Sequence, residues 1–181
     1  MRVISGIYKG RVIKGHDIDG TRPTMDRVKE SLFAIISSYL ENSVVLDLFA
    51  GSGNLGIEAI SNGGKMCYFV DNNIKCIKVI NDNIKTFGIS NNCVTLNSDY
   101  KEALKYFSKR NIKFDIIFVD PPYKFNIMAE LFDLINSNNL LNEKGIIVFE
   151  HQQNDVVENS YFNLLRHKKY GDKFVSIYQK L

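Results

Sequence analysis

The stretch VVLDLFAGSGNLG, residues 44–56, constrains the fold of this chain more than any other. A short, continuously apolar run ends in a glycine turn, and we expect a helix to follow from about Leu55 to Ser61. Such a run is typical of a buried parallel strand, although periodicity alone does not distinguish it from a buried helix. Gly51 and Gly53 can adopt positive φ and let a ligand approach the backbone. The free N–H groups at the start of the helix would attract an anion or a carboxylate. The alternative is a tight turn that binds nothing.

Three glycines in this stretch, Gly51, Gly53 and Gly56, have the spacing of a dinucleotide-binding loop, but two aspartates favour another cofactor. Asp47 ends the first apolar run, where a nicotinamide fingerprint normally has an apolar residue. Asp71 ends the next run, twenty residues after Gly51, where a carboxylate can accept hydrogen bonds from ribose hydroxyls. The order Asp-x-Phe-x-Gly-x-Gly resembles the start of the S-adenosylmethionine site in doubly wound methyltransferases. The cofactor contacts predicted here are Asp47, Phe49, Gly51, Ser52, Gly53 and Asp71.

A second motif, Asp-Pro-Pro-Tyr at residues 120–123, follows the apolar run FDIIFV. Two prolines have fixed φ and no N–H, so the loop is stiff and can present the Asp120 carboxylate and the Pro121 carbonyl as acceptors. An exocyclic amine is planar and a poor nucleophile, and two acceptors that hold its N–H groups would orient its lone pair toward a methyl donor. Tyr123 offers a ring on which a base can stack, worth roughly 1–3 kcal/mol. Asp120, Pro121 and Tyr123 are therefore the predicted catalytic residues. The alternative is a stiffened turn in which Asp120 caps a helix.

The remaining pattern predicts an α/β fold with a doubly wound, mostly parallel sheet of seven strands. A crossover helix is expected over residues 74–87, with strands over 94–96, 114–119 and 145–149 and a helix over 128–135. Residues 163–169 and 173–180 alternate around Tyr-Gly-Asp and predict a closing antiparallel hairpin. Ligands bind at the carboxyl ends of the strands in such a sheet, which makes Asp99 and Tyr100 candidates for adenine contacts. Asp99 can equally cap the helix that follows it.

Length and composition limit the number of domains and the classes of protein to which the chain can belong. A chain of 181 residues is expected to form one catalytic domain, here residues 21–181, preceded by an appendage over residues 1–20. It contains no run of eighteen apolar residues and starts without an apolar signal segment, which predicts a cytoplasmic protein without a membrane partner. Cys67, Cys76 and Cys93 lack metal-like spacing, so we expect core thiols and no metal. A monomer is the default expectation.

Positive charge gathers at the two ends of the chain. Residues 1–30 carry seven Lys or Arg against four Asp or Glu, and residues 164–181 carry five against one. Basic ends around an acidic middle suggest a face that meets phosphate, although solvated surface charge is the simpler interpretation. Gly6 and Gly10 punctuate two short β-rich segments, which predicts a small N-terminal β-hairpin that faces RNA. The predicted RNA contacts are Arg2, Lys9, Arg11, Arg22, Arg27 and Lys124.

Taken together, these motifs resemble the bacterial 16S ribosomal RNA guanine-N2 methyltransferase family. The resemblance covers nearly the whole chain and rests on Arg-Pro-Thr at 22–24 with DRVKE at 26–30, on LDLFAGSG at 46–53 and on Asp-Pro-Pro-Tyr. It implies methyl transfer from S-adenosylmethionine to the 2-amino group of one guanine in small-subunit ribosomal RNA, in an assembled or assembling 30S particle. On that analogy Asp120 and Tyr123 form the target-base site. Asn54 stands where the family often has a smaller residue.

Three other functions are open at this point. A DNA adenine or cytosine amino-methyltransferase can carry the same Asp-Pro-Pro-Tyr residues, but it usually needs a separate recognition domain. A protein glutamine N-methyltransferase normally has Asn in place of Asp120. A non-catalytic RNA-binding or assembly factor could use the same scaffold, although the intact cofactor and target motifs argue against it.

Overall fold

The computed structural model describes residues 1–15, 23–121, 127–152 and 156–181, and contains one seven-stranded mixed sheet in the order β3-β2-β1-β4-β5-β7-β6. The strands are β1 (Val44–Asp47), β2 (Met66–Asp71), β3 (Cys93–Asn97), β4 (Phe114–Val119), β5 (Leu141–His151), β6 (Phe162–Tyr170) and β7 (Lys173–Lys180). Strands β1 to β5 pair in parallel, whereas β7 runs antiparallel to both β5 and β6. The prediction of a mostly parallel seven-stranded sheet is confirmed.

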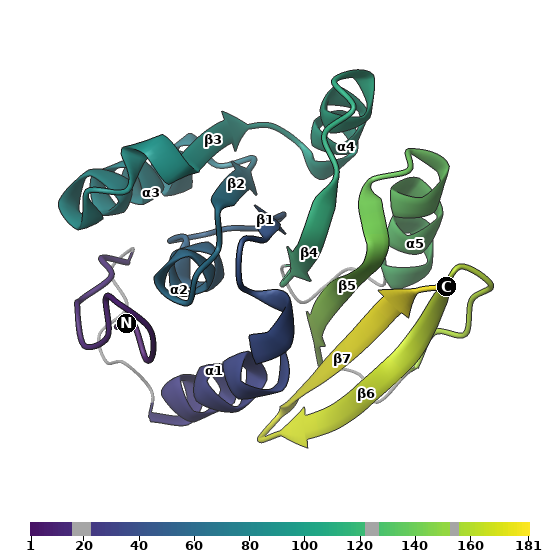
Figure 1. Cartoon of the computed structure of the whole chain (residues 1–181), viewed down its shortest axis with the longest axis horizontal. Helices are drawn as coiled ribbons and strands as arrows, with labels where there is room; N and C mark the ends of the chain where they lie inside the picture. Colours follow the sequence, from purple (N-terminus) through teal and green to yellow (C-terminus); the bar gives the residue numbers. More distant parts are fainter. Residues whose placement is uncertain (16–22, 122–126, 153–155) are drawn as a thin grey trace.

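Helices cover both faces of this sheet (Figure 1). They are α1 (Pro23–Ile35), α2 (Asn54–Ser61), α3 (Ile74–Phe87), α4 (Tyr100–Lys109) and α5 (Met128–Ser137), with short 3-10 turns η1 (Ser37–Tyr39) and η2 (Ser90–Asn92). Helices α1, α2 and α3 pack on one face and α4 and α5 on the other, each over its own apolar cluster. Alternate strand residues serve the two clusters: Val45 and Phe118 face the first, Leu46 and Ile117 the second. The sheet is therefore buried on both sides, as the apolar strands predict.

The strand order reverses between β1 and β4, which are neighbours in space but are separated by two strands in sequence. In an open α/β sheet, the crevice at the carboxyl ends of such a strand pair is the usual ligand site. Both predicted motifs, the glycine loop after β1 and Asp-Pro-Pro-Tyr after β4, begin at this crevice.

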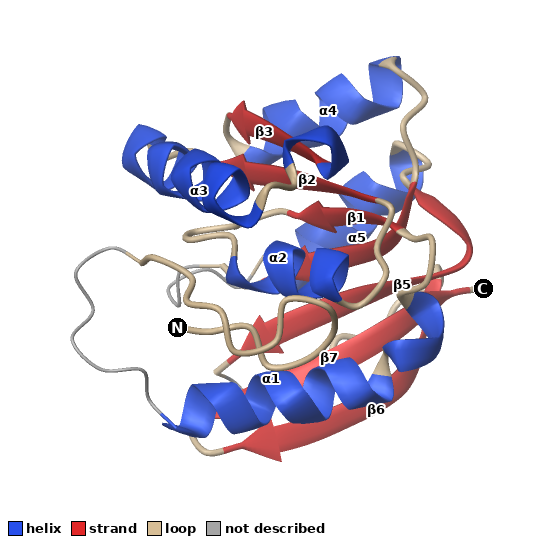
Figure 2. Cartoon of the chain, turned by 60° about the vertical axis from the view of Figure 1, so that its left-hand side comes forward, coloured by secondary structure: helices blue, strands red, loops and turns tan. Residues whose placement is uncertain are grey.

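The predicted N-terminal β-hairpin is wrong as a two-stranded ladder. Residues 1–15 form a single isolated antiparallel bridge, between Arg2 and Val12. Val3, Gly10 and Ile13 still donate to carbonyls of the opposite arm. The ladder goes no further because Ile4 and Ser5 donate to the Glu58 carboxylate and Ile7 donates to the Ser61 carbonyl. The segment lies against α2 instead (Figure 2), and Val3 and Ile13 are buried in the core.

Candidate active site

The glycine loop has the geometry that the sequence predicts. Gly51 and Gly53 have φ of 57° and 81°, in the left-handed region that side chains disfavour. Gly53 is the N-cap of α2 and donates to the Ala50 carbonyl at 2.7 Å. The turn brings the chain from the end of β1 into α2 within six residues, and leaves Gly51 at the mouth of a cleft.

Asp71 braces this loop from the next strand. One of its carboxylate oxygens accepts from the Gly51 N–H at 2.9 Å and the other from the Asn73 N–H at 2.8 Å. A carboxylate has about four acceptor sites, so two backbone bonds leave Asp71 with capacity for a ligand. Asp71 also lines the cleft, at the carboxyl end of β2.

Asp47 lies beneath the loop rather than in the cleft. Its side chain is buried and accepts from the Gly56 N–H at 3.0 Å, within the first turn of α2. Burial raises the pKa of Asp47 to about 7, the Gly56 hydrogen bond opposes that rise, and the charge of Asp71 adds to it. Asp47 therefore anchors the start of α2 in this structure.

The cleft has a volume of about 520 Å³ and lies at the carboxyl ends of β1, β2, β3 and β4. It brings together seven of the predicted site residues: Phe49, Gly51, Asp71, Asp99, Tyr100, Asp120 and Pro121. Asp47, Ser52 and Gly53 are not among its lining residues. Four further lining residues were not predicted from the sequence: Leu48, Asn72, Ser98 and Ile127. The first three directly adjoin predicted site residues in sequence, which is the signal that could have identified them.

Asp99 and Tyr100 form the wall beyond β3. Asp99 is the N-cap of α4 and accepts from the Lys101 N–H at 2.9 Å, so the predicted capping role is present. The Tyr100 ring lies 5.5 Å from the Phe49 ring at an interplanar angle of 44°, and its hydroxyl donates to Glu130 at 2.8 Å. An aromatic pair beside a strand-end carboxylate can hold a planar ring with an amino group.

Asp120 occupies the other end of the cleft, directly after β4. The pKa of Asp120 is raised to about 7, mainly by burial and then by the charge of Glu150, with a smaller contribution from Asp47, while the charge of Lys173 opposes the rise. Glu150 and Lys173 form an ion pair with each other on the neighbouring strands β5 and β7. The other predicted catalytic residue, Tyr123, and the predicted RNA contact Lys124 lie outside the described residues.

The predicted RNA-binding residues of the N-terminal segment fall into two groups. Arg2, Lys9 and Arg27 line a second hollow of about 410 Å³, in which Arg2 Nε lies 3.2 Å from Asp26 Oδ2. Arg11 is not among its lining residues; it donates to the Thr86 carbonyl at 2.6 Å and lies over the Phe87 ring. Arg22 lies outside the described residues.

The described part of the chain holds no group of three or more His, Cys, Asp or Glu side chains arranged to bind a metal ion. Within those same ranges, no helix has the length and apolar character needed to cross a bilayer.

This strand order, with an antiparallel β7 and a glycine loop after β1, is the fold of S-adenosylmethionine-dependent methyltransferases. A solved structure of SMU.776 complexed with SAH shares it with a TM-score of 0.68 at 18% identity, covering 87% of this chain and 50% of that one. The structure of Escherichia coli yhhF superposes with a TM-score of 0.86 at 29% identity, covering 99% and 97% of the two chains.

The chain belongs to the family described as conserved hypothetical protein 95, whose model matches residues 1–179. It is 42% identical to the Bacillus subtilis (strain 168) protein named "Putative rRNA methyltransferase YlbH", over 99% of both chains. It is 32% identical to the Haemophilus influenzae protein named ribosomal RNA small subunit methyltransferase D, over 99% of this chain and 93% of the relative. The predicted family resemblance is confirmed.

Proposed function

We propose that this protein transfers a methyl group from S-adenosylmethionine to the 2-amino group of one guanine in 16S ribosomal RNA. The observation that carries the proposal is the convergence of Asp71, Asp99 and Asp120 on one cleft beside the glycine loop. The relatives named as small-subunit ribosomal RNA methyltransferases support the substrate class. The expected setting is an assembled or assembling 30S particle in the cytoplasm, with the enzyme acting as a monomer.

The residues of the cleft fit the parts of S-adenosylmethionine. Asp71 has spare acceptor capacity for a ribose diol, and Asp99 at the end of β3 is placed for an adenine amino group. Phe49 and Tyr100 supply aromatic surface for the adenine ring, and Gly51 leaves its backbone open to the methionine end. When bound, the cofactor supplies an electrophilic methyl group.

At the other end, the proposed work of the protein is to position a guanine. The Asp120 carboxylate and the Pro121 carbonyl would accept hydrogen bonds from the two N–H groups of the 2-amino nitrogen, which fixes the direction of its lone pair. Positioned acceptors also stabilise the positive charge that grows on this nitrogen as its bond to carbon forms, and ease loss of its proton. The base would be extruded from its stack at a cost of a few kcal/mol, and less for an unpaired loop base. Tyr123 is proposed to stack on it.

Replacement of Asp120 by Ala tests this division of the cleft. The variant should lose methyl transfer to small ribosomal subunits and keep S-adenosylmethionine affinity by calorimetry, because Asp71, Asp99 and Gly51 are untouched. Asp71→Ala is the matched variant, and we expect it to lose cofactor affinity as well. Loss of cofactor binding in Asp120→Ala would remove the assignment of Asp120 to the target base.

A further inference from the structure

The tip of the β6–β7 hairpin carries the densest positive charge in the described part of the C-terminal region. Arg166, Lys168 and Lys169 are exposed, and none of the three forms an ion pair within the ranges that the structure describes. Asp172 is the one acidic residue between 162 and 180. These cations therefore face solvent without internal compensation, as basic residues that meet phosphate do.

The hairpin tip lies at the same edge of the sheet as the target end of the cleft. Val119 of β4 pairs with Phe149 of β5, and β5 then pairs with β7 up to His151 and Phe174. Because β7 runs antiparallel to β5, the turn between β6 and β7 falls at the carboxyl edge, where Asp120 also lies. Strands are spaced by about 4.8 Å, so β6 is roughly 14 Å from β4 across the sheet. That span suits nucleotides that flank a base held at Asp120.

Three contacts fix the tip relative to the active site. The hydroxyls of Tyr170 and Ser31 of α1 lie 2.8 Å apart, and Lys173 pairs with Glu150 of β5. The third contact is a clamp, in which the Ser176 hydroxyl bridges His151 Nε2 and His167 Nδ1, at 2.8 Å from each. A surface held in place on both sides needs little ordering when it binds, which favours affinity.

Aromatic rings lie beside the cations on both faces of the tip, Tyr170 beside Lys168 on one and Phe174 beside Lys169 on the other. His167 stacks on Phe174 with centroids 5.3 Å apart and an interplanar angle of 8°. Lys169 Nζ lies over the Phe174 ring at 5.6 Å, and Lys168 Nζ lies over the Tyr170 ring at 5.0 Å. Basic side chains interleaved with rings are the usual composition of a surface that follows an unpaired nucleic-acid strand.

We propose that Arg166 and Lys168 on one face of the hairpin tip and Lys169 on the other form a phosphate-binding surface around the tip, which holds the RNA strand beside the target guanine. This inference rests on the proposed function and extends it. It assigns RNA binding to the C-terminal hairpin as well as to the N-terminal segment. The competing explanation is edge protection. Strand β6 is the edge of the sheet, it is irregular at Leu165, and lysines on such strands prevent pairing with other sheets.

The test compares two triple variants. Arg166→Gln/Lys168→Gln/Lys169→Gln removes the surface, and Lys65→Gln/Lys109→Gln/Lys113→Gln removes three exposed charges at the opposite, amino edge of the sheet. For each, KM and kcat on unmodified small subunits would be measured at several salt concentrations, with S-adenosylmethionine affinity by calorimetry and the state of association by sedimentation.

The hairpin variant should raise KM about tenfold or more near physiological salt, and its salt dependence should be shallower by about two to three in log–log slope. We expect kcat and cofactor affinity to stay at the wild-type values, and the amino-edge variant to match the wild type throughout. An unchanged KM in the hairpin variant, an equal rise in both variants, or self-association with intact RNA affinity would overturn the inference. Failure of the proposed function can be distinguished from failure of this inference, because in that case the wild type itself would transfer no methyl group to small subunits.

Discussion

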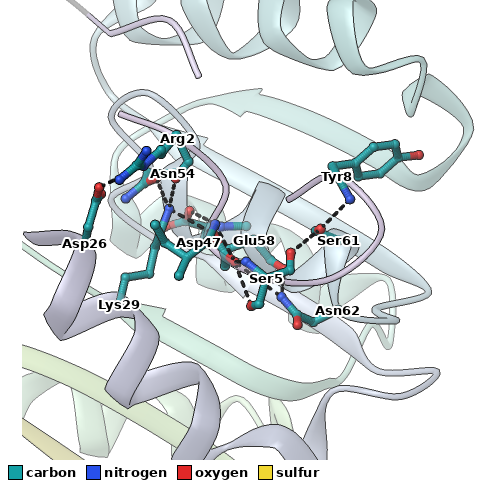
Figure 3. Close-up of polar contacts among 12 residues, drawn as sticks. Arg2, Ser5, Tyr8, Asp26, Lys29, Asp47, Asn54, Glu58, Ser61 and Asn62 are labelled. Carbon is teal, nitrogen blue, oxygen red and sulfur yellow. Dashed lines mark hydrogen bonds and ion pairs between the residues drawn. The ribbon is translucent and has the colours of Figure 1, made fainter. Parts of the chain in front are cut away.

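Lys29 Nζ lies 2.8 Å from Glu58 Oε2, and the two side chains are 4% and 0% exposed (Figure 3). Lys29 comes from α1 and also donates to the Arg2 carbonyl and to the Asn54 side chain at the start of α2. Glu58 comes from α2 and accepts from the backbone of Ile4 and Ser5. This buried pair joins the N-terminal segment, α1 and the helix that follows the glycine loop.

Replacing Lys29 by Met should therefore destabilise the protein by about 3 kcal/mol or more, because it leaves the Glu58 carboxylate buried without its counter-charge. Chemical denaturation gives the free energy of unfolding. Lys9→Met is the matched control, since Lys9 is exposed, and should change stability by less than about 0.5 kcal/mol. Equal effects of the two substitutions would contradict the account of this pair.

The raised pKa of Asp47 predicts a pH-dependent stability. The folded protein keeps a proton on Asp47 up to about pH 7, whereas the unfolded chain releases it near the ordinary aspartate pKa of 3.8. Between these values the folded state binds more protons, so its stability falls as pH rises. The Asp47→Asn variant lacks this titration. Between pH 4 and pH 7, the free energy of unfolding of the wild type should therefore fall by up to ~4 kcal/mol more than that of the variant.

Denaturation curves of both proteins from pH 4 to pH 8 measure this difference. The charge of Asp47 also raises the pKa of Asp120, so the difference between the two proteins contains this coupling as well as the titration of Asp47 itself. Asp82→Asn makes the same chemical change at an exposed site of α3 and should follow the wild type. Parallel curves for the wild type and Asp47→Asn would show that the buried carboxyl does not titrate in this way.

Gly56 is required by packing rather than by backbone conformation. A Cβ at this position would lie 2.3 Å from a carbon of the Phe69 ring and 2.6 Å from Cys67 Sγ, both buried. Gly56→Ala should cost about 1–3 kcal/mol and weaken cofactor binding, because α2 and the loop before it must shift. Phe69→Leu in the same chain makes room, so the double variant should be more stable than the sum of the two single effects predicts. Strict additivity would argue against this contact.

The raised pKa of Asp120 predicts how kcat/KM falls on the acid side of the pH–rate profile. Only the ionised carboxyl of Asp120 carries the negative charge that stabilises the positive charge growing on the target nitrogen, so kcat/KM should fall below about pH 7. Glu150 raises the pKa of Asp120, and Glu150→Gln should therefore move this fall to lower pH. Glu143→Gln, at an exposed position of the same strand, should leave the profile in place. If the acid-side fall of kcat/KM occurs at the same pH in Glu150→Gln as in the wild type, Asp120 does not determine it.

Most of the sheet can be predicted from the sequence because each of these strands is a local apolar run bounded by turn residues. The shared position of the glycine loop and the strand-end aspartates could also be predicted, because the carboxyl ends of parallel strands lie at the same edge of the sheet. The N-terminal hairpin was predicted wrongly because the N–H groups of Ile4 and Ser5 bind Glu58, more than fifty residues away, and no local pattern shows that contact. The position of Asp47 beneath the loop was also hidden, because it depends on the direction of one side chain toward the Gly56 N–H.

The most direct test of the proposed function is transfer of labelled methyl from S-adenosylmethionine to unmodified small ribosomal subunits, with free ribosomal RNA and duplex DNA alongside. Nucleoside analysis then identifies the modified base. The account predicts label in N2-methylguanine from the subunit and none in DNA. Label in methyladenine or methylcytosine, label confined to DNA, or no transfer despite cofactor binding would contradict it.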